Sequence, residues 1–231
     1  MMPVRGLDRL PKLLSGKPLS FLPRGRDETA SILLSQDIPV TSKRGAPIVV
    51  GFFGRRGQGK SLAMTALAHF LRKAALDKGG DLRILANYWV KFAYASHPYL
   101  LDWLLAFPPE ARDCLLLVDE ISVFVSRRRS MSRSNVLFGA FLQQIRKRQI
   151  EVIWTTQFPT QIDYDTLTQT DLFVEVARSP DARHVLCHVY DWWGQWSGVY
   201  KHKPWPPLRE YADHSFWLRN VDKVWTLYDT T

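Results

Sequence analysis

The stretch Gly54-Arg55-Arg56-Gly57-Gln58-Gly59-Lys60-Ser61 decides the fold of this 231-residue chain. It fits the pattern G-x-x-x-x-G-K-[ST], in which glycines let several backbone N–H groups curl around one phosphate. The apolar run 47–53 precedes it, and apolar residues at helical spacing follow it from Leu62 to Leu76. Strand, loop and helix in this order predict a phosphate-binding loop at a helix N-terminus, rather than a glycine-rich turn that matches by chance.

The loop predicts a nucleotide site of the P-loop NTPase type, with ATP and Mg²⁺ as the expected ligands. Lys60 would reach the β- and γ-phosphates, and the Ser61 hydroxyl would hold Mg²⁺. The expected nucleotide-binding residues are Gly54, Arg55, Arg56, Gly57, Gln58, Gly59, Lys60, Ser61 and Leu62. Arg55 and Arg56 make the loop unusually basic, and whether they touch nucleotide or DNA is left open.

A second motif places two acids after four apolar residues, in Leu115-Leu116-Leu117-Val118-Asp119-Glu120. In P-loop proteins such a strand ends beside the phosphate loop, so Asp119 is expected to hold Mg²⁺ through its water shell. Glu120 is expected to orient and deprotonate the attacking water, which favours hydrolysis over a switch or phosphoryl-donor role. The alternative is that the two acids only start the next loop. The guanine-reading pattern N-K-x-D is absent, so a GTPase is not expected.

Two further residues complete the expected catalytic set. Gln157 follows the strand-like run 150–156 and would emerge at the carboxyl edge of the sheet, where it could sense the γ-phosphate; a solvated amide is the alternative. Arg146 lies late in an expected helix, beside Lys147 and Arg148. Basic residues there complement the negative end of a helix, but Arg146 could instead reach a neighbouring subunit's γ-phosphate.

Alternation of apolar strands with helices predicts an α/β fold with a mostly parallel sheet covered by helices on both faces. The expected strands are 48–53, 82–87, 114–119, 150–156 and 172–176, and the expected helices are 60–77, 97–106 and 134–148. A basic, proline- and glycine-rich arm is expected over 1–40, ahead of a P-loop ATPase domain over 41–231. From about residue 184 we expect a small C-terminal β extension, with a hairpin of 184–190 and 198–203 and a strand or turn at 224–228.

The net charge of +9 and a pI near 9.7 favour a polyanionic partner, with nucleic acid before an anionic membrane surface. One basic cluster consists of Arg127, Arg128, Arg129 and Arg133. It is expected to contact DNA, with nucleotide sensing at a subunit boundary as the competing role. No apolar run approaches the ~20 residues of a membrane span. Cys114 and Cys187 lie in strand-like runs and are expected to be buried thiols.

The loop, the L-L-L-V-D-E strand, the helix F-L-Q-Q-I-R-K-R and the strand V-I-W-T-T-Q together resemble the FtsK–HerA superfamily of ring-forming DNA-pumping ATPases. The short chain most resembles the genome-packaging ATPases of tailless icosahedral viruses with an internal membrane. The resemblance covers about residues 46–178. It implies Lys60, Ser61, Asp119 and Glu120 as the ATP and Mg²⁺ site, Gln157 as sensor and Arg146 as a finger acting in trans.

This resemblance implies a motor that translocates double-stranded DNA into a preformed capsid, as a hexameric or pentameric ring. Its partners would be portal proteins at a capsid vertex or membrane, and its location the host cytoplasm or the virion vertex. Morphogenesis ATPases like the zonula-occludens-toxin-like proteins of filamentous phages are the second interpretation. These proteins usually carry a membrane span after the ATPase domain, and the sequence shows no apolar run of that length, so this interpretation ranks below packaging. A nucleotide-dependent DNA-binding protein with little turnover is the third, and Glu120 speaks against it.

The C-terminal part is rich in tryptophan, with Trp192, Trp193, Trp196, Trp205, Trp217 and Trp225 all after residue 190. These side chains could pack in a small hairpin, meet a partner surface or stack on bases. Packing is the preferred interpretation. His184, Cys187 and His188 lack a paired C-x-x-C, so packing is also expected for them rather than a zinc site.

Overall fold

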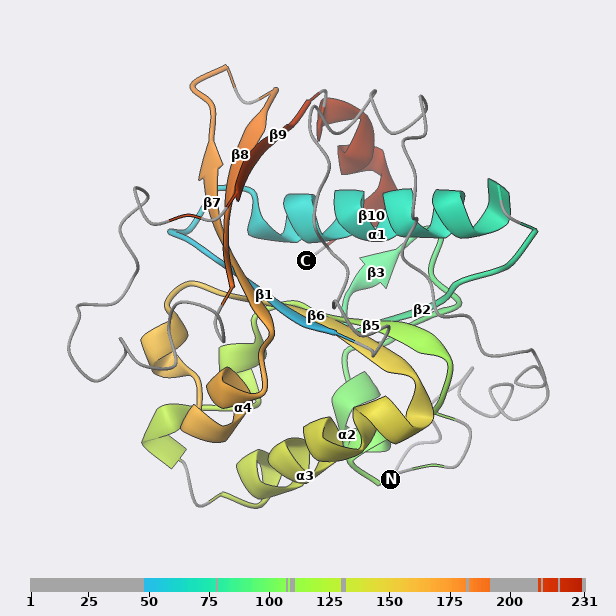
Figure 1. Cartoon of the computed structure of the whole chain (residues 1–231), viewed down its shortest axis with the longest axis vertical. Helices are drawn as coiled ribbons and strands as arrows, with labels where there is room; N and C mark the ends of the chain where they lie inside the picture. Colours follow the sequence, from blue (N-terminus) through green and yellow to red (C-terminus); the bar gives the residue numbers. More distant parts are fainter. Residues whose placement is uncertain are drawn as a thin grey trace.

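The architecture is an eight-stranded, mostly parallel sheet between two layers of helices (Figure 1). The structure, a computed structural model, describes residues 48–77, 79–106, 108, 111–129, 132–181, 183–191, 212, 214–219 and 221–229. The arm expected over 1–40 lies outside the described residues. The eight-stranded sheet confirms the prediction of an α/β fold with a mostly parallel sheet.

The order across the sheet is β4-β2-β5-β6-β1-β7-β8-β9. The first six strands in this order run parallel, and the last two extend the sheet as antiparallel strands at one edge. The strands are β1 (Val49–Phe53), β2 (Arg83–Ala86), β4 (Ala95–Ser96), β5 (Cys114–Val118), β6 (Ile150–Thr156), β7 (Leu172–Arg178), β8 (Val185–Asp191) and β9 (His214–Leu218). A separate antiparallel pair joins β3 (Trp89–Val90) to β10 (Tyr228–Asp229).

Helices cover both faces of the sheet, as expected. Helix α1 (Lys60–Asp77) packs on one face together with the 3₁₀ helix η8 (Val221–Leu227). The opposite face carries α2 (Leu100–Leu105), α3 (Arg133–Arg148) and α4 (Tyr164–Thr168). Figure 1 shows α1 and the red C-terminal segment above the sheet, with α2, α3 and α4 below it.

A glycine in β1 lets the central strands pack closely. Gly51 lies opposite Trp154 of β6, and a Cβ at Gly51 would overlap the indole ring. Trp154 is fully buried and contacts Phe173 of β7 edge to face. Because the interior is close-packed, any side chain at position 51 would displace this tryptophan and shift the strand that leads into the phosphate loop.

Local pattern located most of the elements. The helix expected over 60–77 and the strand expected over 150–156 have these bounds in the structure, and the other expected elements up to residue 178 differ by at most three residues at either end. Short elements were missed: β3, β4, α4 and the 3₁₀ helices η3 (Ile121–Val123), η4 (Arg127–Arg129) and η5 (Pro159–Gln161). They are too short to show a hydrophobic period.

The C-terminal extension differs from the expected hairpin. Strand β8 joins the main sheet, pairing with β7 on one side and with β9 on the other. The hairpin's second strand, expected over 198–203, lies outside the described residues. Residues 224–228, expected as a strand or turn, are the end of η8 and the start of β10. No described helix has the length and apolar character needed to cross a membrane.

The cysteines lie where the sequence places them: Cys114 and Cys187 are both buried free thiols, and burial raises the pKa of each. His188 accepts or donates a hydrogen bond with Ser215 of β9, at 2.7 Å. Trp217 and Trp225 are 39% and 51% exposed, so neither is a core residue. The other four C-terminal tryptophans lie outside the described residues.

Candidate functional site

The phosphate loop joins β1 to α1 at the carboxyl edge of the sheet. Gly54, Gly57 and Gly59 have φ values of 152°, 78° and 86°, a region that side chains other than glycine rarely adopt. At Gly54 a Cβ would also meet the backbone oxygen of Val176 at 2.7 Å. These glycines let the chain curl back over the start of α1, which is the geometry that holds a phosphate.

Lys60 begins α1 and is only 6% exposed. Its Nζ lies 3.4 Å from the backbone oxygen of Arg55 and 3.9 Å from Oε1 of Glu120. Burial lowers the pKa of Lys60, while the charges of Glu120 and Asp119 act in the opposite direction. The ammonium thus lies between its own loop and the end of β5, where a nucleotide's phosphates would take the place of Glu120 as its partner.

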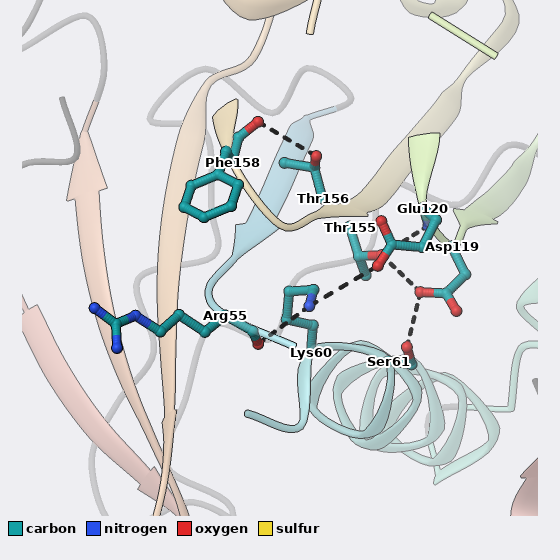
Figure 2. A network of polar contacts seen from close by, with 8 residues as sticks. All are labelled: Arg55, Lys60, Ser61, Asp119, Glu120, Thr155, Thr156 and Phe158. Carbon is teal, nitrogen blue, oxygen red and sulfur yellow. Dashed lines mark hydrogen bonds and ion pairs between the residues drawn. The ribbon is translucent and has the colours of Figure 1, made fainter. Parts of the chain in front are cut away.

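Ser61 and Asp119 meet across the site. The Ser61 hydroxyl donates to Oδ1 of Asp119 at 2.8 Å, and Thr155 Oγ1 donates to the same oxygen at 2.6 Å (Figure 2). Thr155 is fully buried near the end of β6. This carboxylate oxygen is therefore fixed by two hydroxyls from two different elements.

Asn87 holds the backbone of Asp119 from the other side. Its Nδ2 donates to the Asp119 carbonyl at 3.0 Å, and its Oδ1 accepts from the Asp119 N–H at 2.7 Å. Asn87 follows β2, the neighbour of β5. Neither Asn87 nor Thr155 belongs to a motif that could be recognised in the sequence. Their one sequence signal is a polar residue at the end of a strand expected to flank the acidic one.

Glu120 adopts a left-handed backbone conformation, with φ 47° and ψ 57°. Its N–H donates to Thr155 Oγ1 at 2.9 Å. Such a conformation costs a non-glycine residue about 1–2 kcal/mol, and strain of this kind concentrates at functional sites. In this conformation the Glu120 side chain lies near Lys60, with Oε1 3.9 Å from Nζ.

These contacts arise because four neighbouring parallel strands end at one edge. The order β2-β5-β6-β1 brings together Asn87, Asp119, Thr155 and the phosphate loop. In open α/β sheets, ligands bind outside this carboxyl edge. Lys60, Ser61, Asp119 and Glu120, which the sequence singled out separately, lie together here.

The remaining loop residues divide by position. Leu62 belongs to the core under the loop. Arg55 and Arg56 are exposed, and in Figure 2 the Arg55 guanidinium points away from Lys60. Gln58 has a role that the sequence did not reveal: its Oε1 accepts from the Arg178 N–H at 2.9 Å, which anchors the loop to the end of β7.

Gln157 comes directly after β6, whose last residue Thr156 pairs in register with Phe53, the last residue of β1. It therefore lies one residue beyond the strand, at the same edge as the phosphate loop, and is partly exposed. This is the position that the sensor prediction requires; the role itself stays a prediction.

Arg146 lies at the amino edge of the sheet, where the parallel strands begin, opposite the carboxyl edge that carries the phosphate loop. Its Nη2 is 3.8 Å from Oδ1 of Asp171, whose Oδ2 accepts from the N–H of Val49 at the amino end of β1. The side chain of Arg146 is 66% exposed. The length of β1, about 3.3 Å per residue, separates it from its own phosphate loop. A role in trans stays a prediction, and it requires a neighbour to present its nucleotide to this amino edge.

Arg127 and Arg128 are exposed in η4, which follows the acidic strand by way of η3. They line an open hollow with the exposed ring of Phe158. The rest of the lining is polar: Ser122, Ser126, Thr160 and Gln161. Two segments that leave the nucleotide site, one after Glu120 and one after Gln157, therefore form this hollow.

The donor set suits Mg²⁺. No cluster of three or more His, Cys, Asp or Glu able to hold a metal occurs among the described residues. Instead one hydroxyl and one carboxylate, those of Ser61 and Asp119, lie 2.8 Å apart beside the phosphate loop. Magnesium typically binds through one or two oxygen ligands of the protein plus phosphates and water, so these residues fit.

No family model matches the chain, and no curated protein matches it in sequence. Among solved structures, the N-terminal domain of zonular occludens toxin from Neisseria meningitidis is similar, with a TM-score of 0.58 at 18% identity. The match covers 80% of this chain and 100% of that domain.

Two weaker matches are the genome-packaging NTPase B204 of Sulfolobus turreted icosahedral virus 2 with AMP and the FIGL-1 AAA domain with ADP. The first has a TM-score of 0.45 at 14% identity, over 63% of this chain and 92% of that one. The second has a TM-score of 0.41 at 19% identity, over 62% and 48%. The chain has the P-loop NTPase fold.

Proposed function

We propose that the protein is a Mg²⁺-dependent ATPase that drives virion morphogenesis. One observation carries the enzymatic part: Lys60 and Ser61 of the phosphate loop contact Glu120 and Asp119 of the acidic strand. Groups for phosphate, metal and water are thus assembled at one edge within a single chain.

The four side chains have distinct tasks. Lys60 would bind the β- and γ-phosphates, releasing Glu120 from the ion pair. Glu120 would then accept a proton from the attacking water. The water oxygen forms a bond to the γ-phosphorus, while the bond between the γ-phosphorus and the β–γ bridging oxygen breaks and ADP leaves. A bound Mg²⁺, held by Ser61 and Asp119, would neutralise charge on the phosphate oxygens. Gln157 is proposed to contact the γ-phosphate or the water from β6.

Virion extrusion is the form of morphogenesis that the fold comparison favours. From sequence, genome packaging ranked first and zonula-occludens-toxin-like extrusion second. The fold match spans the whole N-terminal domain of that toxin at a TM-score above 0.5, while the match to the packaging NTPase falls below it. The order of the two interpretations is therefore reversed, and packaging of double-stranded DNA remains as the second candidate on its motifs alone.

Turnover measurements test the enzymatic proposal and separate the candidates. The full chain should release phosphate from ATP with Mg²⁺, and Lys60→Ala should not. A wild-type protein that binds ATP without turnover would support the nucleotide-dependent scaffold instead. Strong stimulation by duplex DNA would favour packaging, whereas turnover indifferent to duplex DNA would favour extrusion.

We place DNA binding, as part of this proposal, at the hollow that Arg127 and Arg128 line. Guanidinium groups beside hydroxyls suit phosphates of any base sequence, so binding should weaken steeply with salt. Replacing Arg127, Arg128 and Arg129 together by alanine should reduce the slope of log affinity against log salt by about one for each phosphate that is no longer neutralised. An unchanged slope would leave nucleotide sensing at a subunit boundary as their role.

A further inference from the structure

The C-terminal segment lies beside the nucleotide site rather than at the periphery. Val221 and Val224 of η8 are buried in the core that α1 shares, and β10 pairs with β3. Figure 1 shows this red segment over α1, the helix that begins at the phosphate loop. The last described part of the chain thus packs against α1, the helix that begins at the phosphate loop.

Side chains connect this segment to Ser61, the proposed metal ligand. The ring of Tyr228 in β10 contacts that of Tyr88 edge to face, with centroids 6.2 Å apart. The Tyr88 hydroxyl is 2.8 Å from Oγ1 of Thr65, which in turn donates to the backbone oxygen of Ser61 at 2.7 Å. Burial, and after it the charge of Asp119, raise the pKa of Tyr228.

Arg178 brings a tryptophan next to the phosphate loop. The Arg178 backbone N–H donates to Gln58 of the loop, while its guanidinium carbon lies 4.9 Å from the centre of the Trp225 ring. Half of Trp225 nevertheless stays exposed, at 51%. A large aromatic surface therefore remains open to solvent one side chain away from the loop.

The guanidinium of Arg178 has unused hydrogen-bonding capacity. Its Nε is shielded from solvent, and no acceptor lies within hydrogen-bond distance among the described residues. A buried donor without a partner costs about 1–3 kcal/mol. An exposed ring and an unsatisfied donor at one place, both beside a phosphate loop, indicate a ligand that is part aromatic and part polar.

We propose that Trp225 and Arg178 form the nucleoside subsite, where the base of the bound nucleotide stacks on the indole and the ribose or α-phosphate accepts from Arg178. This inference rests on the proposed ATPase function, because the phosphates fix where the nucleoside leaves the loop. The base, the Trp225 ring and the Arg178 guanidinium would form one stack. Stacking tolerates any base, so this subsite strengthens nucleotide binding without selecting adenine strictly.

Calorimetry with ATP and with inorganic tripolyphosphate, each with Mg²⁺, tests the subsite in the full chain. Trp225→Ala should weaken ATP binding about ten- to hundredfold and leave tripolyphosphate binding unchanged, because only ATP carries a base. Trp225→Phe should restore most of the ATP affinity. Arg178→Gln should also weaken ATP more than tripolyphosphate.

Trp217→Ala is the matched control. Trp217 is another exposed C-terminal tryptophan on β9. Its neighbour Leu218 is buried in the core shared with α1, and successive strand residues alternate between faces, so Trp217 points to the face of the sheet away from α1. This variant should bind both ligands as the wild type does.

Three results would overturn the inference: unchanged ATP affinity in Trp225→Ala, an equal loss for both ligands, or a loss in Trp217→Ala of the same size. A wild-type protein that binds neither ligand would instead refute the ATPase proposal itself.

Discussion

The two edges of the central sheet both carry charged residues, but they use them differently. At the carboxyl edge, Asp119 is held by side chains from three other segments of the chain: Ser61, Asn87 and Thr155. At the amino edge, Arg146 pairs with Asp171 at 3.8 Å, and Arg83 with Asp113 at 3.9 Å. Short contacts that converge on one residue, two of them on a single carboxylate oxygen, indicate a site built for a ligand, whereas the longer ion pairs link neighbouring segments of the fold.

Arg146 gives the largest expected effect, because a catalytic role for it would mean that the amino edge also takes part in turnover. If this arginine serves a neighbour's nucleotide, Arg146→Ala should lose about 10³–10⁵-fold in turnover while ATP binding persists. Phosphate release and equilibrium ATP binding would be measured on the same preparations. Lys147→Ala, an exposed neighbour on α3, should keep full turnover.

Mixing two inactive variants, so that they assemble into common rings, gives the second half of that test. Combining Arg146→Ala with Glu120→Gln should restore part of the activity, because some interfaces would pair an intact arginine with an intact base. Full activity of Arg146→Ala alone would leave its pair with Asp171 as a purely structural contact at the amino edge.

Glu120 tests whether a carboxylate at the carboxyl edge is needed for turnover when one at the amino edge is not. Glu120→Gln should lower turnover by about 10²-fold or more and keep ATP binding, because the amide cannot accept the proton from water. The amino-edge variant Glu151→Gln is the control and should turn over ATP normally. Equal turnover of Glu120→Gln and wild type would remove Glu120 from the role of base.

Asn87 tests whether the partners of Asp119 matter as well as Asp119 itself. Asn87→Ala should raise the Mg²⁺ concentration needed for half-maximal turnover about tenfold, because residues that orient a metal ligand contribute on this scale. A Mg²⁺ titration of phosphate release measures this, with thermal unfolding as the check on folding. An unchanged Mg²⁺ requirement would mean that Ser61 and Thr155 suffice to orient the carboxylate.

Glu151 on β6 is expected to affect stability alone and to leave turnover unchanged. Burial raises its pKa from 4.5 to about 7. The unfolded chain therefore releases this proton at lower pH than the folded one, so stability falls as pH rises from about 4.5 to 7 and is then constant. Relative to wild type, Glu151→Gln should gain about 2–3 kcal/mol of stability between pH 5 and pH 8, since one pKa unit corresponds to ~1.4 kcal/mol. Denaturant unfolding at pH 5 and pH 8 measures the difference, and equal gains at both would contradict it.

Local pattern was sufficient for the phosphate loop and the acidic strand. The loop and its helix form one continuous segment, and its glycine spacing is typical of a phosphate-binding loop. The acids at 119 and 120 follow an unbroken apolar run. Thr155 and Asn87 could not be assigned in the same way. Each lies more than 30 residues from Asp119 and looks like an ordinary polar residue at the end of a strand.

By itself, the sequence determined a P-loop α/β protein with Lys60, Ser61, Asp119 and Glu120 as the candidate reacting set. Glycines, β-branched runs and helical spacing act over a few residues, so they can be read in order along the chain. Only the tertiary structure decided that Arg146 lies at the edge opposite its own loop, that Gln58 is anchored to Arg178 120 residues away, and that Trp225 lies beside that anchor. Those relations depend on strand order and on which face a segment packs against, and both are set by how distant apolar surfaces bury one another.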